Sequence, residues 1–451
     1  MASSTRILWI AILASFVSFL DGTVVNVALP AIDRELGGGL ATQQWVVDGY
    51  LITLGALMLV AGSISDAYGR GLVMRIGLIG FGVASVVIAV APDPVILVVA
   101  RALQGAAGAF LVPSSLAMIT STFSGAAQAK AIGTWTSLTT GAMVAGPLIG
   151  GLLIDLASWR LAFLINVLPI AVAMWLMRGY SDPPRRPDAH IDVLSATLCT
   201  LGLGAFVFGL IEQPRLGWAH PAIPISLVGG AVLFAVFLIR QRGVASPILP
   251  LDLFRVRNFW VGNITTTFVY AGLALNGFVI AVYLQEGAGL SATLAGLASL
   301  PLTILMILLS SRMGALAGKH GPRAFMAAGP LIMAAGSVMF LAVREDFSYW
   351  WQVLPGMIVF GLGLSIMVAP LTAAILGSIE PERSGIASAV NNAISRVAGL
   401  VAVAAIGTIV GGTLDLDGFY RCALVVAALM AAGGLVSLAG IRNPAKEQAE
   451  A

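Results

Sequence analysis

Long apolar runs are the feature that most restricts the fold of this chain. A helix that crosses a bilayer needs about 20 mostly apolar residues. Strands of a closed barrel would instead show short segments of alternating polarity, unlike these continuous, Gly- and Ala-rich runs. The runs lie near residues 7–30, 45–65, 72–91, 95–122, 131–154, 161–177, 192–212, 221–240, 259–284, 292–314, 324–343, 351–377, 386–412 and 419–440. The sequence therefore predicts an all-α polytopic membrane protein with fourteen transmembrane helices.

The composition leaves too little polar material for a water-exposed surface. Hydrophobic residues make up 59% of the chain and charged residues 10%, whereas soluble domains carry about 25% charged residues. A lipid bilayer must therefore cover the helices. The net charge of +3 is spread along the chain rather than gathered in one patch, so no nucleic-acid partner is expected.

Basic loop residues predict the orientation in the membrane. An even number of spans places both termini on one side, and Lys and Arg gather in cytoplasmic loops. Of the 24 Lys and Arg residues, seventeen fall on the side of the termini, and five fall on the other side, at Arg34, Arg160, Arg215, Arg344 and Arg421. Both termini are therefore predicted to be cytoplasmic, in a multi-pass protein of the cell (inner) membrane.

Charged residues inside the apolar runs need a separate explanation. Asp21, Asp48, Arg101 and Arg396 lie within predicted spans, where an ionisable side chain is costly and usually faces a partner or a cavity. The first helix is expected to end near Pro30. From the helical rise, Asp21 lies roughly 13 Å and Arg101 roughly 9 Å below the outer ends of their helices. These depths allow the two side chains to pair.

Two loops show an internal repeat. GSISDAYGRG and GALAGKHGPR, at 62–71 and 314–323, both place glycines seven residues apart and carry basic residues towards the cytoplasmic end. If the runs at 192–212 and 221–240 are set aside, each loop falls between the second and third helices of a six-helix half.

The repeat predicts two six-helix bundles joined by a two-helix linker hairpin. The predicted N-terminal bundle covers residues 1–178. A cytoplasmic loop and the two linker helices follow at 179–258. The C-terminal bundle and a short cytoplasmic tail occupy 259–451.

Five sequence blocks carry a family resemblance, and together with the helix count it extends over nearly the whole chain. The blocks are LDGTVVNVALP at 20–30, GSISDAYGRG at 62–71, ARALQGAAGAFLVP at 100–113, GAMVAGPLIGG at 141–151 and SWRLAFLINVLP at 158–169. They resemble the major facilitator superfamily, and within it the branch of fourteen-helix drug/proton antiporters. The resemblance implies alternating access by an exporter that exchanges protons for small organic, amphipathic or drug-like molecules.

The resemblance also implies a proton-coupling site. Asp21, Arg101 and Asp48 are its predicted members, and the acid is expected to change partner as the protein changes conformation. The alternative is a permanent structural ion pair. Glu286 adds an acid that the family pattern does not require.

The first repeat loop resembles the gating motif of the family. Gly62, Asp66, Gly69 and Arg70 are expected to hold the inner gate shut. A helix dipole disfavours an acid at a helix C-terminus, and Arg70 would compensate it. The alternative is a solvated turn with ordinary topogenic charge. The second loop has Gly318 where the first has the acid, which argues against a symmetric two-site mechanism.

Small residues in the fifth predicted helix match a further motif. Gly141, Gly146, Pro147, Gly150 and Gly151 resemble the antiporter motif, which in the family marks exporters rather than importers. Glycines permit close helix packing and proline permits a kink. We expect this packing also to seal one side of the membrane against leak.

Five polar residues in the spans are candidates for the substrate cavity: Asn26, Tyr270, Asn276, Asn391 and Arg396. A broad-specificity cavity has few fixed contacts, so the pattern does not name the substrate. For Asn391 and Arg396 the alternative is a hydrogen-bonded structural knot between the halves. For Tyr270 and Asn276 the alternative is helix packing.

Other function classes find little support. His190, His220 and His320 lie in or near loops without metal-ligand spacing, and no Gly-rich phosphate loop is present. No enzyme activity, metal or cofactor is predicted. The expected partners are protons, a small-molecule substrate and the bilayer around a monomer. An importer or facilitator of a small metabolite, or an exporter of lipid-like substrates, remains as an alternative within transport.

Overall fold

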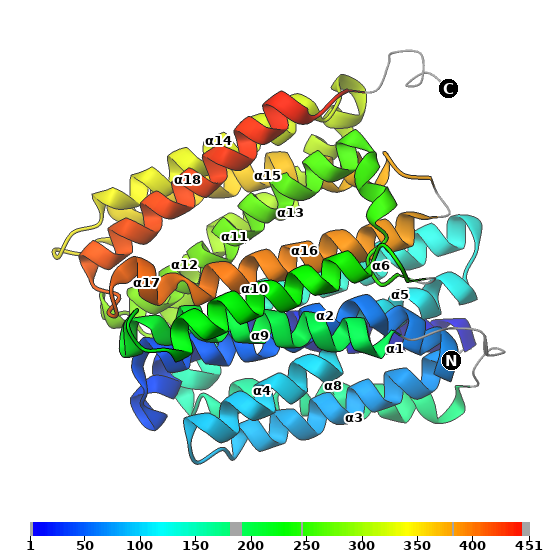
Figure 1. Cartoon of the computed structure of the whole chain (residues 1–451), viewed down its shortest axis with the longest axis horizontal. Helices are drawn as coiled ribbons and strands as arrows, with labels where there is room; N and C mark the ends of the chain where they lie inside the picture. The colour runs from blue at the N-terminus through cyan, green and yellow to red at the C-terminus, as the bar shows by residue number, and fades with distance from the viewer. Residues whose placement is uncertain (1–2, 181–191, 245–246, 381–382, 444–451) are drawn as a thin grey trace. The chain divides into compact units, whose positions relative to one another are not determined.

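The structure is a computed structural model that describes residues 3–180, 192–244, 247–380 and 383–443. Across these ranges all regular secondary structure is helical, and no β-strand occurs in them (Figure 1). The prediction of an all-α protein is confirmed. By contact the chain forms two compact units, Met1–Ile248 with Leu290–Gly296, and Leu249–Gly289 with Leu297–Ala451.

Unit 1 is built around α1. It contains α1 (Ser3–Leu36), α2 (Gly39–Tyr68), α3 (Arg70–Ala89), α4 (Pro94–Gly108), α5 (Leu111–Thr122), α6 (Gly125–Leu156), α7 (Arg160–Leu164), α8 (Val167–Leu176), α9 (Val193–Leu216), α10 (Ala222–Arg240) and the first turn of α12 (Ala292–Ala298). The helix α1 packs against α5, α6 and α8, while α2 packs against α4 and α9. Fully buried apolar side chains, among them Ile10, Phe81 and Met118, fill the space between these helices.

Unit 2 is a second helical bundle. It contains the end of α12, α11 (Arg257–Glu286), α13 (Leu300–His320), α14 (Arg323–Met339), α15 (Leu354–Leu376), α16 (Ser384–Ala404), α17 (Ile406–Val410) and α18 (Leu416–Gly440). The helix α11 packs against α16 and α18, and α15 packs against α13 and α14. Both units therefore have a first helix in contact with several others.

Within the described residues, twelve helices are long and apolar enough to cross a bilayer. Two predicted spans are not among the twelve. The segment Arg160–Leu176 is apolar but shorter, and α2 is 30 residues long. The multi-pass architecture is confirmed, while the count of fourteen stays a prediction.

Prolines change three predicted helix boundaries. The predicted end near Pro30 is wrong, because α1 continues through that residue to Leu36. The predicted span at 95–122 is confirmed as one apolar segment, Pro94–Thr122, although its helix is interrupted between Gly108 and Leu111. The span at 161–177 breaks between α7 and α8. Pro113 and Pro169 follow these breaks, and a proline cannot donate to the carbonyl four residues earlier.

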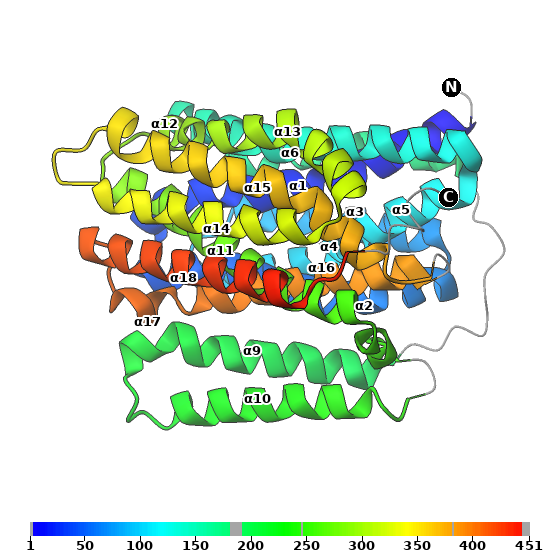
Figure 2. The same cartoon turned by 90° about the horizontal axis from the view of Figure 1, so that it is seen from above.

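The predicted linker helices pack on each other. In Figures 1 and 2, α9 and α10 lie side by side. Asp192 accepts hydrogen bonds from the backbone and hydroxyl of Ser195 and pairs with Arg240 at 3.1 Å. Burial opposes ionisation of Asp192, but the hydrogen bonds from Ser195 and Arg240 outweigh it and lower its pKa. The role of the two linker helices stays a prediction, as does the predicted division of the chain at residues 178 and 258.

Candidate functional site

A buried ion pair lies at the centre of unit 1. Arg101 of α4 donates from Nη1 to Oδ2 of Asp21 on α1 at 2.6 Å. Both side chains are 1% exposed. The pairing expected from helix depth is thus observed, and it joins two of the three predicted coupling residues.

Two amides complete the shell of the Asp21 carboxylate. Gln104, one turn after Arg101, donates to Asp21 Oδ1 at 3.1 Å and to the Ser85 hydroxyl at 2.9 Å. Asn166 donates to the same Oδ1 at 3.1 Å from the break between α7 and α8. Asp21 therefore accepts from three side chains, and an ionised carboxylate is suited to accept that many hydrogen bonds.

Arg101 has further partners that hold it in place. Its Nε donates to the Val46 carbonyl at 2.9 Å, and its guanidinium lies 4.4 Å from the centre of the Tyr50 ring. Gly105 allows α2 and α4 to approach, because a Cβ there would lie 2.2 Å from the Tyr50 carbonyl oxygen. The guanidinium is thus held by α2 and α4 as well as by α1.

Asp48 lies in a different environment. It is fully buried, and neither carboxylate oxygen has a hydrogen-bond partner among the residues that the structure describes. One turn earlier on α2, Trp45 donates from Nε1 to Glu212 of α9 at 3.0 Å, and Arg215 pairs with the same acid at 2.7 Å. Unit 1 therefore buries two aspartates, one fully partnered and one without a described partner.

The antiporter motif packs beside the Asp21 cluster. A Cβ on Gly146 would lie 2.1 Å from the Thr23 hydroxyl, and one on Gly150 would lie 2.9 Å from the Val24 side chain. Thr23 and Val24 lie two and three residues after Asp21 on α1, so α6 contacts the same turn of helix. Gly141, also predicted as a motif member, has no such neighbour within 4 Å.

The other end of the motif contacts the start of α12. A Cβ on Gly151 would lie 2.6 Å from the Ala292 carbonyl oxygen, and one on Gly296 would lie 2.4 Å from the Pro147 carbonyl oxygen. Asp155 then accepts from the backbone of Ala292 at 3.1 Å and of its neighbour at 2.8 Å. The motif therefore joins α1 to α12 through α6.

The loop between α2 and α3 turns at Gly69, whose φ of 98° disfavours other residues. Arg70 donates to the Ala117 carbonyl of α5 at 2.9 Å, which ties the loop to its own bundle. The side chain of Asp66 and the surroundings of Gly62 lie outside the described part of the chain. The gating role of the four predicted residues stays a prediction.

We expect Gly69→Leu to reduce transport severalfold at near-normal membrane levels. Backbone strain of this kind costs about 1–3 kcal/mol, and it falls on the loop that would close the gate. Asp66→Asn should have the same effect. Gly133→Leu is the matched control, because that helical glycine has no neighbour within 4 Å. Whole-cell efflux measured with immunoblotted membrane levels tests both variants, and wild-type transport in both would rule out the gate.

A polar group joins α11 to α16 in unit 2. Asn391 donates to Asn263 Oδ1 at 3.1 Å and to the Thr266 hydroxyl at 2.8 Å. The sequence did not single out Asn263 or Thr266, although both lie in α11 one turn apart. Asn391 is therefore partnered within its own unit.

The remaining predicted cavity residues are less satisfied. Arg396 is half-buried, and its Nε is shut off from solvent without an acceptor among the described residues. It acts electrostatically on Tyr270 of α11. Asn276 is buried, and Asn26 of α1 is half-buried. Within unit 2, Tyr270 and Arg396 lie near enough to interact, and the shared cavity of the five predicted residues stays a prediction.

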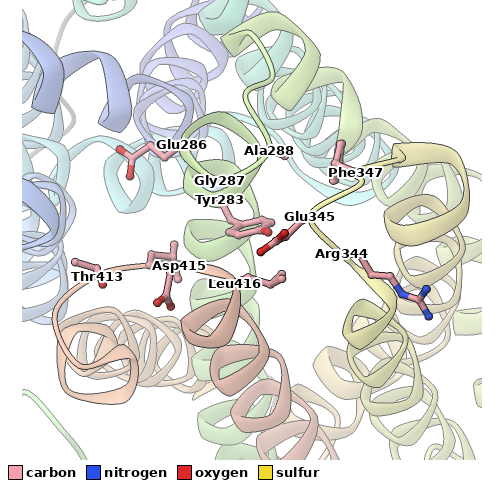
Figure 3. Close-up of a pocket in the computed structure, with 11 residues that line it drawn as sticks. Tyr283, Glu286, Gly287, Ala288, Arg344, Glu345, Phe347, Thr413, Asp415 and Leu416 are labelled. Atoms are coloured by element: carbon pink, nitrogen blue, oxygen red, sulfur yellow. The ribbon is translucent and has the colours of Figure 1, made fainter.

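A pocket of about 540 Å³ lies at one end of unit 2 (Figure 3). Tyr283 of α11 faces it, and its ring stacks on Phe419 at 4.3 Å. Glu286, Glu345 and Asp415 are among the lining residues. None of the predicted coupling, gating or cavity residues lines this acidic pocket.

The profile of the Major Facilitator Superfamily matches residues 11–403. The chain belongs to the major facilitator superfamily. The family resemblance is therefore confirmed. The superfamily consists of transporters, which supports the prediction that the chain is not an enzyme.

Curated superfamily relatives are similar over most of the chain. It is 34% identical to a probable actinorhodin transporter of Streptomyces coelicolor, covering 89% of this chain and 71% of the relative. It is 31% identical to a methylenomycin A resistance protein of Bacillus subtilis, covering 90% and 88%. It is 30% identical to a tetracenomycin C resistance and export protein of Streptomyces glaucescens, covering 86% and 73%.

Solved superfamily structures share the fold. A peptide transporter POT in complex with sulfate matches with a TM-score of 0.72 at 14% identity, over 97% of this chain and 94% of that one. A D-xylose-proton symporter matches with a TM-score of 0.68 at 14% identity, over 97% and 98%. At this identity the likeness concerns the fold alone.

Proposed function

We propose that the chain is a proton-coupled exporter of small organic, amphipathic or drug-like molecules that works by alternating access. The buried cluster around Asp21 carries this proposal, because a titratable group with three side-chain donors lies inside a membrane-spanning bundle. The relatives named as antibiotic transport, resistance and export proteins support the direction and the substrate class.

Protonation of Asp21 would weaken the link between α1 and α4, which then depends on the hydrogen bond from Gln104. A protonated carboxyl carries no charge and must donate one hydrogen bond, so its bond to Arg101 weakens. Arg101 keeps its bonds to Gln104 and to the Val46 carbonyl. It also keeps its contact with the Tyr50 ring, so it stays held while its bond to α1 weakens.

Movement of α1 would then reach α6. Thr23 packs against Gly146, and Val24 packs against Gly150. Both contacts are so close that a Cβ on either glycine of α6 would overlap the α1 side chain. The far end of the same helix holds the first turn of α12 through Asp155. A proton at Asp21 is thus positioned to change the packing of the motif that we expect to seal one side.

Asp48 is the second proton-carrying candidate. An ionised carboxylate without a partner is far more costly to bury than a protonated one. The Asp48 site therefore suits a neutral carboxyl group, whereas the Asp21 site suits an anion. Two carboxyl groups in different protonation states would allow one bundle to bind and release protons in sequence.

The alternatives differ in direction and in substrate. An importer or facilitator of a small metabolite needs no antiporter seal, and the close α1–α6 packing favours the exporter. A lipid-like substrate remains compatible with the apolar helices. If the protein exports a water-soluble dye from the cytoplasm, rather than a dye dissolved in the membrane, the drug-like substrate class is favoured over the lipid-like class.

Coupling is tested with a substrate selected by efflux screening in cells that lack their main pumps. In proteoliposomes with an imposed pH gradient, we expect uphill movement of that substrate against the proton flow. A protonophore should stop it, whereas ATP should have no effect. Uphill movement that survives collapse of the gradient would contradict proton coupling.

The proposed orientation places both termini in the cytoplasm, in a cell (inner) membrane. We expect a cysteine at His320, at the end of α13, and one at Ser348, before α15, to be labelled from opposite sides of the membrane. Cys199 and Cys422 are both buried and would be replaced by Ser first. Labelling of both sites from the same side by an impermeant maleimide would overturn this topology.

A further inference from the structure

Arg101 and Arg396, which both lie deep inside predicted spans, have opposite surroundings. Arg101 is held by Asp21, Gln104 and a backbone carbonyl. Arg396 has no hydrogen bond or ion pair with any residue of the described ranges, and its Nε is shut off from solvent. An intramembrane guanidinium without a counter-ion is costly, so Arg396 is retained for a partner that the protein itself does not supply.

No acid of the second half is placed to neutralise Arg396. From 259 to 440, every Asp and Glu lies outside the predicted spans, in loops or at helix ends. In the first half, Asp21 is already paired with Arg101, and neither oxygen of Asp48 is bonded to any described residue, Arg396 included. Arg396 lies twelve residues into α16, roughly 18 Å along the helix, which is too deep for a lipid headgroup.

The face of α16 that carries Arg396 is polar and open. Ser388, Asn392 and Arg396 are spaced by four residues and share one side of the helix. Asn392 is exposed, although it lies in the middle of a membrane-spanning segment. The neighbouring side packs closely on α11, where a Cβ on Gly399 would lie 3.1 Å from the Ala274 methyl group. A face with a charge and an exposed amide lines a cavity rather than lipid.

The groups on this face are mainly hydrogen-bond donors. Arg396 offers only donors, and Asn392 keeps one N–H of its amide beyond the one that donates to the Ser388 carbonyl at 3.0 Å. From α11, the Tyr270 hydroxyl can also donate. Tyr270 is near enough to interact electrostatically with Arg396. Such a set complements a planar oxyanion, because a guanidinium binds carboxylates with two parallel hydrogen bonds.

We infer that the Arg396 face of α16 binds an acidic group of the substrate, a carboxylate or a phenolate on an apolar body. The site selects organic anions over cations of the same size. This inference rests on the proposed export function and names the substrate class for it.

The test compares three probes that share one aromatic body. They are 1-naphthoate, 1-naphthylmethanol and 1-naphthylmethylammonium, which carry negative, zero and positive charge. In the purified full-length protein, naphthyl fluorescence should report tightest binding for the anion. Arg396→Gln should weaken naphthoate binding about tenfold, as expected for the loss of a charge-assisted hydrogen bond, and Arg396→Lys should restore most of it.

Binding of the neutral probe shows whether a variant loses recognition of the negative charge or loses the folded site. Binding of 1-naphthylmethanol should not change in Arg396→Gln, and a variant of an exposed arginine after α18 in the same unit, Arg442→Gln, should bind all three probes normally. Equal loss of all three probes, or unchanged naphthoate binding in Arg396→Gln, would overturn the inference. Proton-driven export of cations alone would overturn it while leaving the proposed function intact. An anion preference without proton dependence would count against the proposed function alone.

Discussion

Replacing Asp21 by Asn is expected to abolish uphill, proton-driven export. The amide has the same shape, and its oxygen still accepts from Gln104 or Asn166, but it neither binds nor releases a proton. We expect the accumulated substrate gradient to fall about tenfold or more, to the level of empty proteoliposomes, because coupling needs an intramembrane group that titrates. Substrate binding should survive, since no candidate substrate contact is removed.

The same change should lower stability. It leaves Arg101 buried without a counter-ion, and breaking a buried pair in this way costs about 3–5 kcal/mol. Retained bonds to Gln104 and the Val46 carbonyl offset part of that cost. Size-exclusion chromatography and thermal unfolding in detergent therefore accompany the transport assay, so that lost coupling is separated from lost protein.

Asp346→Asn is the matched control for Asp21→Asn. Asp346 is exposed in a loop of unit 2, so the same chemical change should leave transport and stability unaltered. If Asp21→Asn pumps uphill with normal proton dependence, the coupling group lies elsewhere, and Asp48→Asn becomes the next variant to measure. If both buried aspartates are dispensable, the proposed coupling mechanism fails.

The depth of a residue along its helix could be predicted from the sequence. The direction in which its side chain points around the helix axis could not. The rise per residue and the hydrophobic boundaries placed Asp21 and Arg101 at similar depths, and the ion pair follows from that. Gln104 lies one turn from Arg101 in the same sequence block, so its helical spacing was a usable signal. Asn166 lies at a helix break, and its approach to Asp21 depends on tertiary packing that no local pattern encodes.

Prolines show the same limit. Pro30 lies inside a continuous α1, whereas Pro113 and Pro169 follow breaks. All three lack an N–H donor, so the difference comes from how neighbouring helices and polar groups accommodate the freed carbonyl. A sequence pattern marks such positions but does not decide between a bend and a break.

The glycines of the antiporter motif differ in the same way. Gly141 and Gly151 belong to one motif on one helix, but only Gly151 lies against another segment of backbone. Judged by sequence spacing alone, the two glycines are equivalent members of the motif. Their different surroundings turn the sealing hypothesis into a comparison between two variants of identical chemistry.

Gly151→Leu is expected to reduce export to background. Its Cβ would lie 2.6 Å from the Ala292 carbonyl oxygen and 2.7 Å from the Thr293 Cα. Both are backbone atoms that cannot rotate away, so α6 and the start of α12 must separate. Overpacking of this kind costs about 1–3 kcal/mol, and the separation should also strain the two hydrogen bonds that Asp155 accepts there.

Gly141→Leu is the control that decides what Gly151→Leu means. Nothing lies within 4 Å of a Cβ at Gly141, and leucine favours a helix over glycine by about 1 kcal/mol, so transport and thermal stability should stay at wild-type values. Proteoliposomes with an entrapped pH dye measure leak directly. If the contact with α12 forms the seal, Gly151→Leu should pass protons without substrate and Gly141→Leu should not. Equal leak in the two variants, or in neither, would contradict a sealing role, because their helix, residue type and substitution are the same and only the contact with α12 differs.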